Sequence, residues 1–271
     1  DEPVDQVTRP AGDVGEAWRQ HRQRVLDVCY RMLGSLTEAE EALQETFARL
    51  TRHGLDGIDD VCGWLVTVAA RVCLDRLRAD RSRARYIGPW LPTPIIDPPA
   101  SGVDPADRVT LDDSVRFALL TVLERLSPAE RVVFVLHDVF GYPFELVAGI
   151  VGRTPAACRK LASRARAALR DDVEPRVPVK PGVATELARR FADACATGDL
   201  DALLGLLDPN AVGEFDSGGL IYGAPVTAQV GAHLVAATLI RAFTGSTATF
   251  SPVIVNTQPG VTVTLHGRTV A

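Results

Sequence analysis

Basic side chains are concentrated in two short segments of a chain that is acidic as a whole. Six arginines fall between residues 71 and 85, and five arginines with one lysine fall between residues 153 and 170, where no acidic residue occurs. The formal net charge of the chain is −5. Guanidinium and ammonium groups bind phosphate, so the two segments predict two contacts with nucleic acid. The alternative is that both segments are solvated helix faces.

The second basic segment lies within a pattern typical of a helix-turn-helix. A short helix is expected over about 143–151, Gly152 supplies the tight turn, and Thr154-Pro155 begins a second helix with the threonine as its N-cap. In that motif the second helix enters the major groove of DNA. A helical hairpin without DNA contacts is the alternative. The predicted DNA-binding residues of this segment are Thr154, Pro155, Ala156, Arg159, Lys160, Ser163, Arg164 and Arg166.

The first basic segment follows an aromatic residue near the start of another predicted helix. Apolar residues recur at three- and four-residue steps over about 61–77. Trp64 offers a surface on which an unpaired base can stack, and the arginines after it can bind the phosphates of a single strand. The alternative is that Trp64 belongs to the core. The DNA-binding candidates of this segment are Trp64, Arg71, Arg76, Arg78, Arg81 and Arg83.

An acidic and polar helix face precedes both basic segments. Thr37 and Glu40 have the spacing of a capping box, which predicts that this helix begins near Thr37. One side of the helix then carries Glu41, Gln44 and Glu45 beside apolar residues. Such a face suits a basic surface on a partner protein, and an ordinary solvated face is the alternative.

Helical periodicity covers the first two thirds of the chain in two blocks. Apolar spacing predicts helices over 16–85 and again over about 111–168. In the second block Ser127-Pro128 is expected to begin a helix, with the serine as N-cap and the proline at the first position. Six prolines between residues 86 and 107 interrupt the pattern. They predict an extended, semi-rigid linker between two helical domains.

The last part of the chain differs from the rest in composition and in its predicted secondary structure. Two helices are expected over 185–207, followed by strand-like runs rich in valine and threonine over 248–255 and 261–266. Gly218-Gly219 and Pro259-Gly260 are the predicted turns. The predicted fold class is therefore mainly α, with two helical domains, the second carrying a helix-turn-helix, and a C-terminal α+β domain.

The sequence gives little sign of targeting, metal or cofactor chemistry. Its first residues are acidic and rich in proline and glycine, and no apolar run is long enough to span a bilayer, so we expect a cytoplasmic protein. The cysteines are scattered, without the spacing of a zinc or redox site. We expect no metal and no cofactor, and we interpret as small apolar residues Cys29, Cys62, Cys73, Cys158 and Cys195.

Both helical blocks resemble the extracytoplasmic-function (ECF) sigma factors. Residues 37–47, Thr-Glu-Ala-Glu-Glu-Ala-Leu-Gln-Glu-Thr-Phe, are similar to the polymerase-binding helix of region two, and residues 63–78 are similar to the helix that meets the melted minus-ten element. Residues 126–170 resemble region four, which binds the minus-thirty-five element. The resemblance implies that promoter DNA and core RNA polymerase are the partners. It assigns polymerase binding to Glu41, Gln44 and Glu45.

The linker and the end of the chain resemble one subtype of that family. Trp90-Leu-Pro-Thr-Pro is similar to a linker motif of sigma factors with a C-terminal SnoaL-like (NTF2-like) domain, and Asp216-Ser-Gly-Gly is similar to a glycine-rich motif of that domain without its usual lysine. The resemblance implies that this domain packs against the linker and regulates the sigma factor. The implied regulatory residues are Trp90, Pro92, Asp216, Gly218 and Gly219.

These patterns together predict a sigma factor that is not itself an enzyme. The predicted domains are 14–86 (region two), 87–108 (linker), 109–172 (region four) and 183–271 (SnoaL-like). One alternative is a helix-turn-helix regulator that never joins polymerase, which would leave the acidic helix face without a role. Another is an enzyme on the C-terminal domain, which would need one titratable group in a closed apolar pocket. Its candidate groups are Asp193, Asp216, Tyr222 and His233.

Overall fold

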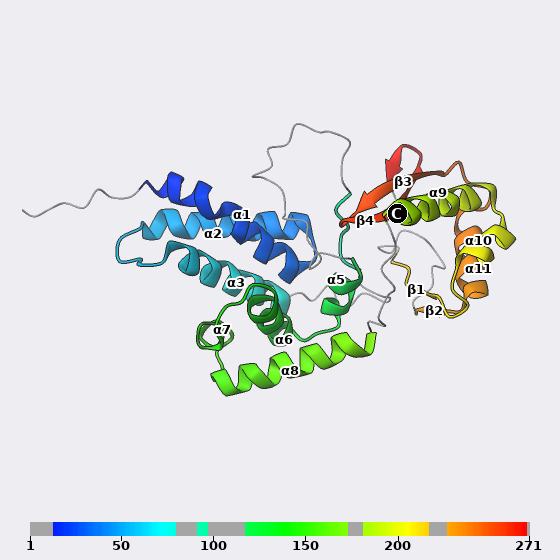
Figure 1. Ribbon diagram of the computed structural model, residues 1–271. Helices are drawn as coiled ribbons and strands as arrows, with labels where there is room; N and C mark the ends of the chain where they lie inside the picture. Colours follow the sequence, from blue (N-terminus) through cyan, green and yellow to red (C-terminus); the bar gives the residue numbers. More distant parts are fainter. Residues whose placement is uncertain (1–12, 80–90, 97–116, 173–180, 217–226, 270–271) are drawn as a thin grey trace, which may run out of the picture. The chain divides into compact units, whose positions relative to one another are not determined.

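The computed structural model describes residues 13–79, 91–96, 117–172, 181–216 and 227–269 of the 271-residue chain (Figure 1). These residues fall into two compact units. The first unit contains 13–79 and 126–167, and the second contains 91–96, 117–125 and the described residues from 168 onward. Within the described ranges, no helix is both long enough and apolar enough to cross a membrane.

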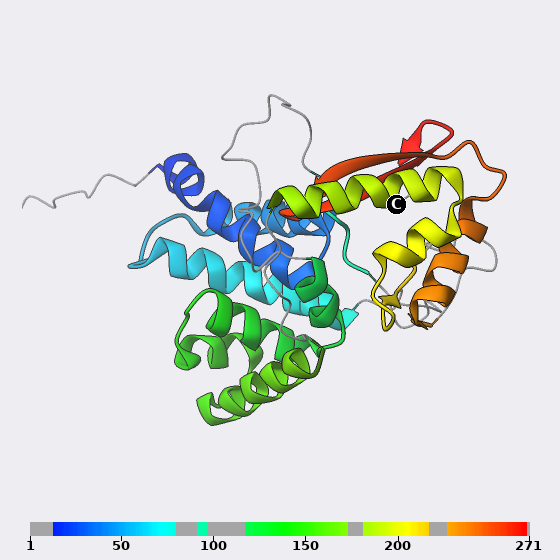
Figure 2. The same ribbon diagram turned by 45° about the vertical axis from the view of Figure 1, so that its right-hand side comes forward.

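Three long helices form one half of the first unit: α1 (Val14–Leu33), α2 (Leu36–His53) and α3 (Val61–Ala79). They lie side by side in both ribbon views, and each packs against the other two (Figures 1 and 2). Burial of their apolar faces supplies the main driving force for this packing. The side chains that share the interior include Val25, Leu26, Met32, Leu43, Leu50, Leu65, Val66 and Leu74.

The predicted start of the second helix is wrong by two residues. Gly34 has φ 73° and ends α1 in the left-handed conformation, so α2 begins almost at once. Ser35 takes the N-cap position, and its hydroxyl accepts a hydrogen bond from Glu38 N at 3.4 Å. Thr37 therefore lies inside the first turn, where its side chain is exposed. The Thr37–Glu40 spacing resembled a capping box, but the serine next to the glycine is the residue that caps.

The other half of the first unit contains the predicted helix-turn-helix. Its elements are α6 (Pro128–Val133), the π-helix η3 (Phe134–Val139), α7 (Phe144–Val151) and α8 (Pro155–Asp172). The predicted helix start at Ser127-Pro128 is confirmed, because the Ser127 hydroxyl accepts from Glu130 N and the Glu130 carboxylate accepts from Ser127 N. This reciprocal pair is a capping box.

The two halves of the first unit are joined by arginine side chains that bind main-chain carbonyls. Arg131 of α6 is 2% exposed, and its Nη1 donates to Met32 O of α1 at 3.1 Å. Arg24 Nη2 donates to Phe140 O at 3.3 Å, and the same guanidinium lies 4.4 Å from the centre of the Phe140 ring. Helix α3 also packs against α6 and α7. The helices α1–α3, α6 and α7 and most of α8 thus share one packed unit, whereas α5 (Phe117–Glu124), which also falls within the predicted region-four domain, belongs to the second unit.

The second unit combines helices of different lengths with two small antiparallel sheets among its described residues. Helix α9 (Pro181–Thr197) lies along the hairpin of β3 (Thr249–Val255) and β4 (Gln258–Leu265), as both views show (Figures 1 and 2). A small core of Ala194, Leu203 and Ala236 joins three of its helices. The remaining elements are α5 (Phe117–Glu124), α10 (Leu200–Leu206), β1 (Val212–Gly213), β2 (Gln229–Val230), α11 (Ala232–Phe243) and β5 (Arg268–Thr269).

The turn of the β3–β4 hairpin lies three residues before its predicted position. Val255 pairs with Gln258, so Asn256 and Thr257 form the turn, with φ 47° and 69°. Two positive φ angles suit a two-residue hairpin loop, and asparagine tolerates them better than most residues. Gly260 lies inside β4, where a Cβ atom would approach Val255 Cγ2 to 2.9 Å. The glycine is therefore explained by close packing and not by the turn.

Candidate functional site

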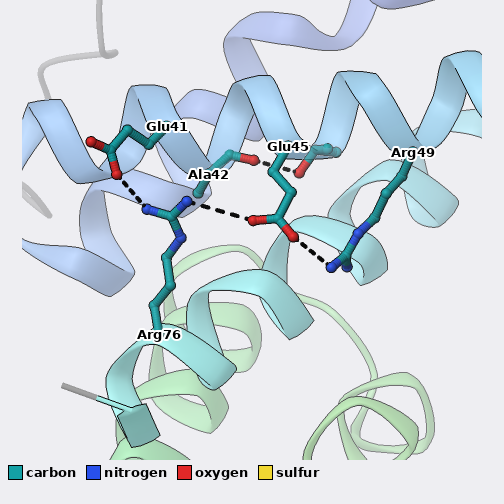
Figure 3. Close-up of polar contacts among 6 residues, drawn as sticks. Glu41, Ala42, Glu45, Arg49 and Arg76 are labelled. Atoms are coloured by element: carbon teal, nitrogen blue, oxygen red, sulfur yellow. Dashed lines mark hydrogen bonds and ion pairs between the residues drawn. The ribbon is translucent and has the colours of Figure 1, made fainter.

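The predicted acidic face of α2 exists, but an arginine of α3 lies across it. Arg76 Nη1 contacts Glu41 Oε2 at 2.8 Å, and Arg76 Nη2 contacts Glu45 Oε2 at 3.5 Å (Figure 3). The other oxygen of Glu45 accepts from Arg49 Nη2 at 2.6 Å. Partial burial acts to lower the pKa of Arg76, but the hydrogen bonds and negative charges of Glu41 and Glu45 together have a larger effect in the opposite direction. The pKa of Arg76 is therefore raised above its usual value. Gln44 is exposed beside this network.

The other candidates of the first basic segment have different surroundings. Trp64 is half-buried, and its ring lies 5.1 Å from that of His53, so it is neither a free platform nor a fully buried core residue. Arg71 Nη2 donates to Gly149 O of α7 at 3.2 Å. Arg78 is exposed and lies 3.9 Å from Asp75 Oδ1. Arg81 and Arg83 lie outside the described residues.

The helix-turn-helix has the predicted local geometry. Gly152 ends α7 with φ 70°, and Thr154 Oγ1 accepts from Ala157 N at 3.2 Å in the first turn of α8. One side of α8 is buried through Cys158, Leu161, Ala162 and Ala165. The other side of the helix is exposed at Ala156, Arg159, Lys160, Ser163 and Arg164. Two further predicted residues, Pro155 and Arg166, are half-buried. A basic, exposed face follows a capped helix start, which is the arrangement needed for contact with a DNA groove.

Three of the basic residues on α8 carry acidic partners that periodicity did not predict. Arg164 Nε lies 3.4 Å from Glu130 Oε1, and Arg166 Nη1 lies 2.6 Å from Asp138 Oδ1. Arg159 Nη2 lies 3.5 Å from Glu145 Oε1. Surface ion pairs of this kind contribute about 0–1 kcal/mol, so a phosphate can replace the carboxylate at small cost. The pairs therefore do not prevent these arginines from binding an anion.

Part of the linker is bound within the second unit by two polar side chains. Leu91 N donates to Asp216 Oδ2 at 3.1 Å, and Ile95 N donates to Asn256 Oδ1 at 2.7 Å. Asn256 N donates in return to Ile95 O at 2.9 Å, and Ile96 forms a β-bridge with Val255. The linker strand therefore extends the β3–β4 sheet at its edge.

Only some of the predicted regulatory residues take part in this contact as the structure describes it. Asp216 does, and Pro92 is buried. Trp90, Gly218 and Gly219 lie outside the described residues. Sequence reasoning missed Asn256, which is fully buried. The signal that could have found it is an asparagine between two valine-rich runs, a common residue for a hairpin turn.

A second contact joins the residue after α5 to the C-terminal part within the same unit. Arg125, which follows α5 directly, places Nη2 2.6 Å from Glu214 Oε1. The arginine side chain is 51% exposed, whereas that of Glu214 is 21% exposed. Glu214 and Asp216 are two residues apart, so one short segment contacts both the linker and the residue after α5.

All five cysteines are free thiols, and three of them are fully buried. Burial raises the pKa of Cys73 and of Cys158, and it raises the pKa of Cys195 to about 11. Thiols of this kind stay protonated at neutral pH and are poor nucleophiles. In the described ranges, no group of three or more His, Cys, Asp and Glu side chains could hold a metal ion.

Comparison with known proteins agrees with this geometry. Residues 17–83, which include α2 and α3, match the Sigma-70 region 2 family, and residues 116–169, which include all but the last turn of α8, match Sigma-70 region 4. The chain is 45% identical over 216 residues to the probable ECF RNA polymerase sigma factor SigI of Mycobacterium tuberculosis, covering 78% of this chain and 73% of that protein. The chain belongs to the ECF sigma factors. Its predicted family is therefore confirmed.

Two further comparisons concern SigJ, and the structural one covers nearly the whole of this ECF sigma factor. It is 41% identical over 207 residues to the ECF RNA polymerase sigma factor SigJ of M. tuberculosis, covering 75% of this chain and 64% of that protein. The crystal structure of that extracytoplasmic function sigma factor SigJ covers 96% of this chain, and the chain covers 89% of it, with a TM-score of 0.69 and 34% identity. The predicted fold class, two helical sigma domains and an additional C-terminal α+β domain, is confirmed.

Proposed function

We propose that this ECF sigma factor joins core RNA polymerase, directs it to promoters with two separated elements, and is regulated by its own C-terminal domain. The support from comparison is the presence of both Sigma-70 regions in one chain that is 45% identical to SigI. The structural observation that carries the proposal is the exposed basic face of α8, the helix whose first turn is capped by Thr154. The bond-making chemistry belongs to the polymerase, with which this chain works in the cytoplasm.

Each element has a separate part in this proposal. The α2 face with Glu41, Gln44 and Glu45 binds polymerase, α3 meets the minus-ten element, and α8 meets the minus-thirty-five element. The C-terminal domain acts through the linker that it binds at Asp216 and Asn256. The proposed domain boundaries are 14–86, 87–108, 109–172 and 183–271.

The surroundings of the candidate catalytic groups favour regulation over catalysis in the C-terminal domain. Asp193 is exposed and paired with Arg189 at 2.6 Å, and His233 is exposed. Asp216 accepts a linker amide. Tyr222 lies outside the described residues. An acid or base with a strongly shifted pKa needs an apolar, water-excluded position, which neither Asp193 nor His233 occupies.

The proposed function is tested by run-off transcription with purified core polymerase and a library of genomic promoters. We expect the full chain to produce discrete transcripts from a small group of promoters that share two elements at a fixed spacing. Core polymerase alone is the control. DNA binding without any polymerase-dependent transcript would contradict the proposal and favour the alternative of a helix-turn-helix regulator.

The polymerase-binding surface is tested by Glu45→Lys and Glu45→Gln. Reversing the charge at this position places a third cation beside Arg49 and Arg76, so we expect affinity for core polymerase to fall by about tenfold. Glutamine removes the charge without this repulsion and should have a smaller effect. Affinity is measured by titration of labelled protein with core polymerase, and circular dichroism checks that α2 is still folded. Equal retention of both variants on core polymerase would show that the interface lies elsewhere.

The minus-thirty-five contact is tested by Arg164→Ala. Arg164 is exposed and its Nε lies 3.4 Å from Glu130 Oε1, so its guanidinium can reach a phosphate by leaving one long surface pair. Loss of one phosphate contact should lower promoter affinity and reduce the slope of log K against log salt by about one. Fluorescence anisotropy at several salt concentrations measures this slope. Arg190→Ala, an exposed position of α9 outside both basic segments, is the matched control, and an unchanged slope for Arg164→Ala would contradict the contact.

A further inference from the structure

Arg76 was predicted to bind DNA, but its side chain belongs to a different surface. It projects from the last turns of α3 toward α2, where its two terminal nitrogens contact two different carboxylates (Figure 3). The side chain is 31% exposed, whereas Arg78 on the same helix is 53% exposed and has one acidic neighbour at 3.9 Å. To reach a phosphate, Arg76 would have to leave both carboxylates. Arg78 would have to leave the longer contact with Asp75.

The carboxylates that Arg76 contacts are two of the three side chains assigned to polymerase binding. Glu41 and Glu45 are one helical turn apart on α2, so their like charges repel each other in the absence of a cation. The guanidinium of Arg76 lies between them, and Arg49 holds the far oxygen of Glu45. Each carboxylate can accept more hydrogen bonds than it receives here. A partner can therefore bind both groups while Arg76 remains in place.

We infer that Arg76 is a positioning residue of the polymerase-binding surface, which holds the carboxylates of Glu41 and Glu45 side by side for a basic surface of core polymerase. Glutamate loses considerable rotamer freedom when a partner immobilises it, and a contact made before binding removes that cost from the binding step. The inference rests on the proposed function, because it assumes that these two carboxylates meet polymerase. It adds that the partner recognises a fixed pair of carboxylates and not a diffuse negative charge.

The direction of one substitution separates positioning from simple charge attraction. Arg76→Gln makes the α2 face more negative, so attraction by charge alone predicts tighter binding to basic polymerase. Positioning predicts the opposite, and we expect affinity for core polymerase to fall by about three- to tenfold. Arg76→Lys keeps the charge but cannot form the same two-nitrogen bridge. Its affinity should lie between those of the wild type and Arg76→Gln.

The experiment titrates labelled full-length chain with core polymerase for the wild type, Arg76→Gln, Arg76→Lys and the matched control Arg78→Gln. Addition of Glu41→Gln should weaken binding in the wild-type background but have little further effect in the Arg76→Gln background, since positioning makes the two changes non-additive. Thermal unfolding of each variant checks the fold. A merely structural role would lower stability without this coupling, and that result would overturn the inference.

The remaining outcomes are equally decisive. Tighter or unchanged core binding by Arg76→Gln would overturn the positioning role. A second contrary result would be normal core binding together with weaker promoter binding by the assembled holoenzyme and a smaller slope of log K for promoter binding against log salt. That pattern would identify Arg76 as a phosphate contact and would overturn the positioning role. If the wild type itself fails to bind core polymerase, the proposed function fails, and this result is distinguishable from failure of the inference alone.

Discussion

Replacing Asn256 by glycine is expected to release the linker from the C-terminal domain while the β3–β4 hairpin stays in place. The Asn256 side chain accepts from Ile95 N at 2.7 Å, and its main chain donates to Ile95 O at 2.9 Å. Glycine adopts a φ of 47° without strain, so the substitution removes the side-chain contact and leaves the turn intact. The Ile95 amide then loses the acceptor that holds it at the sheet edge.

Hydrogen exchange at the linker amides measures this release. The bond at the Ile95 amide is partly buried, and an unpaired donor there costs about 1–3 kcal/mol, so this amide should exchange roughly tenfold to a hundredfold faster in Asn256→Gly than in the wild type. Thr257→Gly is the matched control, because Thr257 also has a positive φ in the same turn and makes neither of the two linker bonds. Equal protection of Ile95 in the wild type and Asn256→Gly would contradict the capture of the linker by Asn256.

Release of the linker should also change transcription, because a semi-rigid linker sets the separation of the two promoter-binding regions. We expect deletion of residues 183–271 to change promoter-dependent transcription without abolishing core binding. Asn256→Gly should reproduce part of that change, and so should Trp90→Ala. If the truncated chain transcribed identically to the full chain on its own promoter, regulation by this domain would be disproved and an enzymatic role for it would gain support.

The sequence was sufficient for features that depend on neighbouring residues. The Ser127 cap, the Thr154 cap and the division of α8 into buried and exposed sides follow from local residue types and spacing, and the structure contains all of them. Local spacing failed where two patterns competed. Ser35 and Thr37 are both good caps, and the left-handed Gly34 decided between them.

Contacts between distant residues were beyond prediction from one sequence. Arg76 and Glu41 are 35 residues apart, and Ile95 and Asn256 are 161 apart. Periodicity placed Arg76 on a helix but gave no information about the helix opposite, so its charge suggested phosphate when its partners are carboxylates. The linker was recognised by its tryptophan and prolines, whereas the contacts that the structure describes use main-chain amides, which leave no mark on the residue types.

Arg131 is expected to be among the most sensitive positions for the stability of the first unit. Its Nη1 donates to Met32 O, a carbonyl in the last turn of α1, where carbonyls have no amide donor within the helix. The positive charge of Arg131 also interacts favourably with the negative end of the helix dipole. The side chain is 2% exposed, so its stem packs in the interior as well. Arg131→Ala should lower the free energy of unfolding by about 2–4 kcal/mol, because it leaves a cavity and an unpaired buried carbonyl.

Urea unfolding followed by tryptophan fluorescence tests this expectation in a Trp90→Phe background, in which the remaining tryptophans, Trp18 and Trp64, both lie in the first unit. Arg131→Met keeps an apolar stem and loses the charged donor, so it should recover part of the stability and separate packing from the combined effect of the hydrogen bond and the charge. The exposed Arg153→Ala is the control and should change stability by less than about 0.5 kcal/mol. A loss for Arg131→Ala no larger than that of the control would show that the bond to Met32 does not hold the two halves of the unit together.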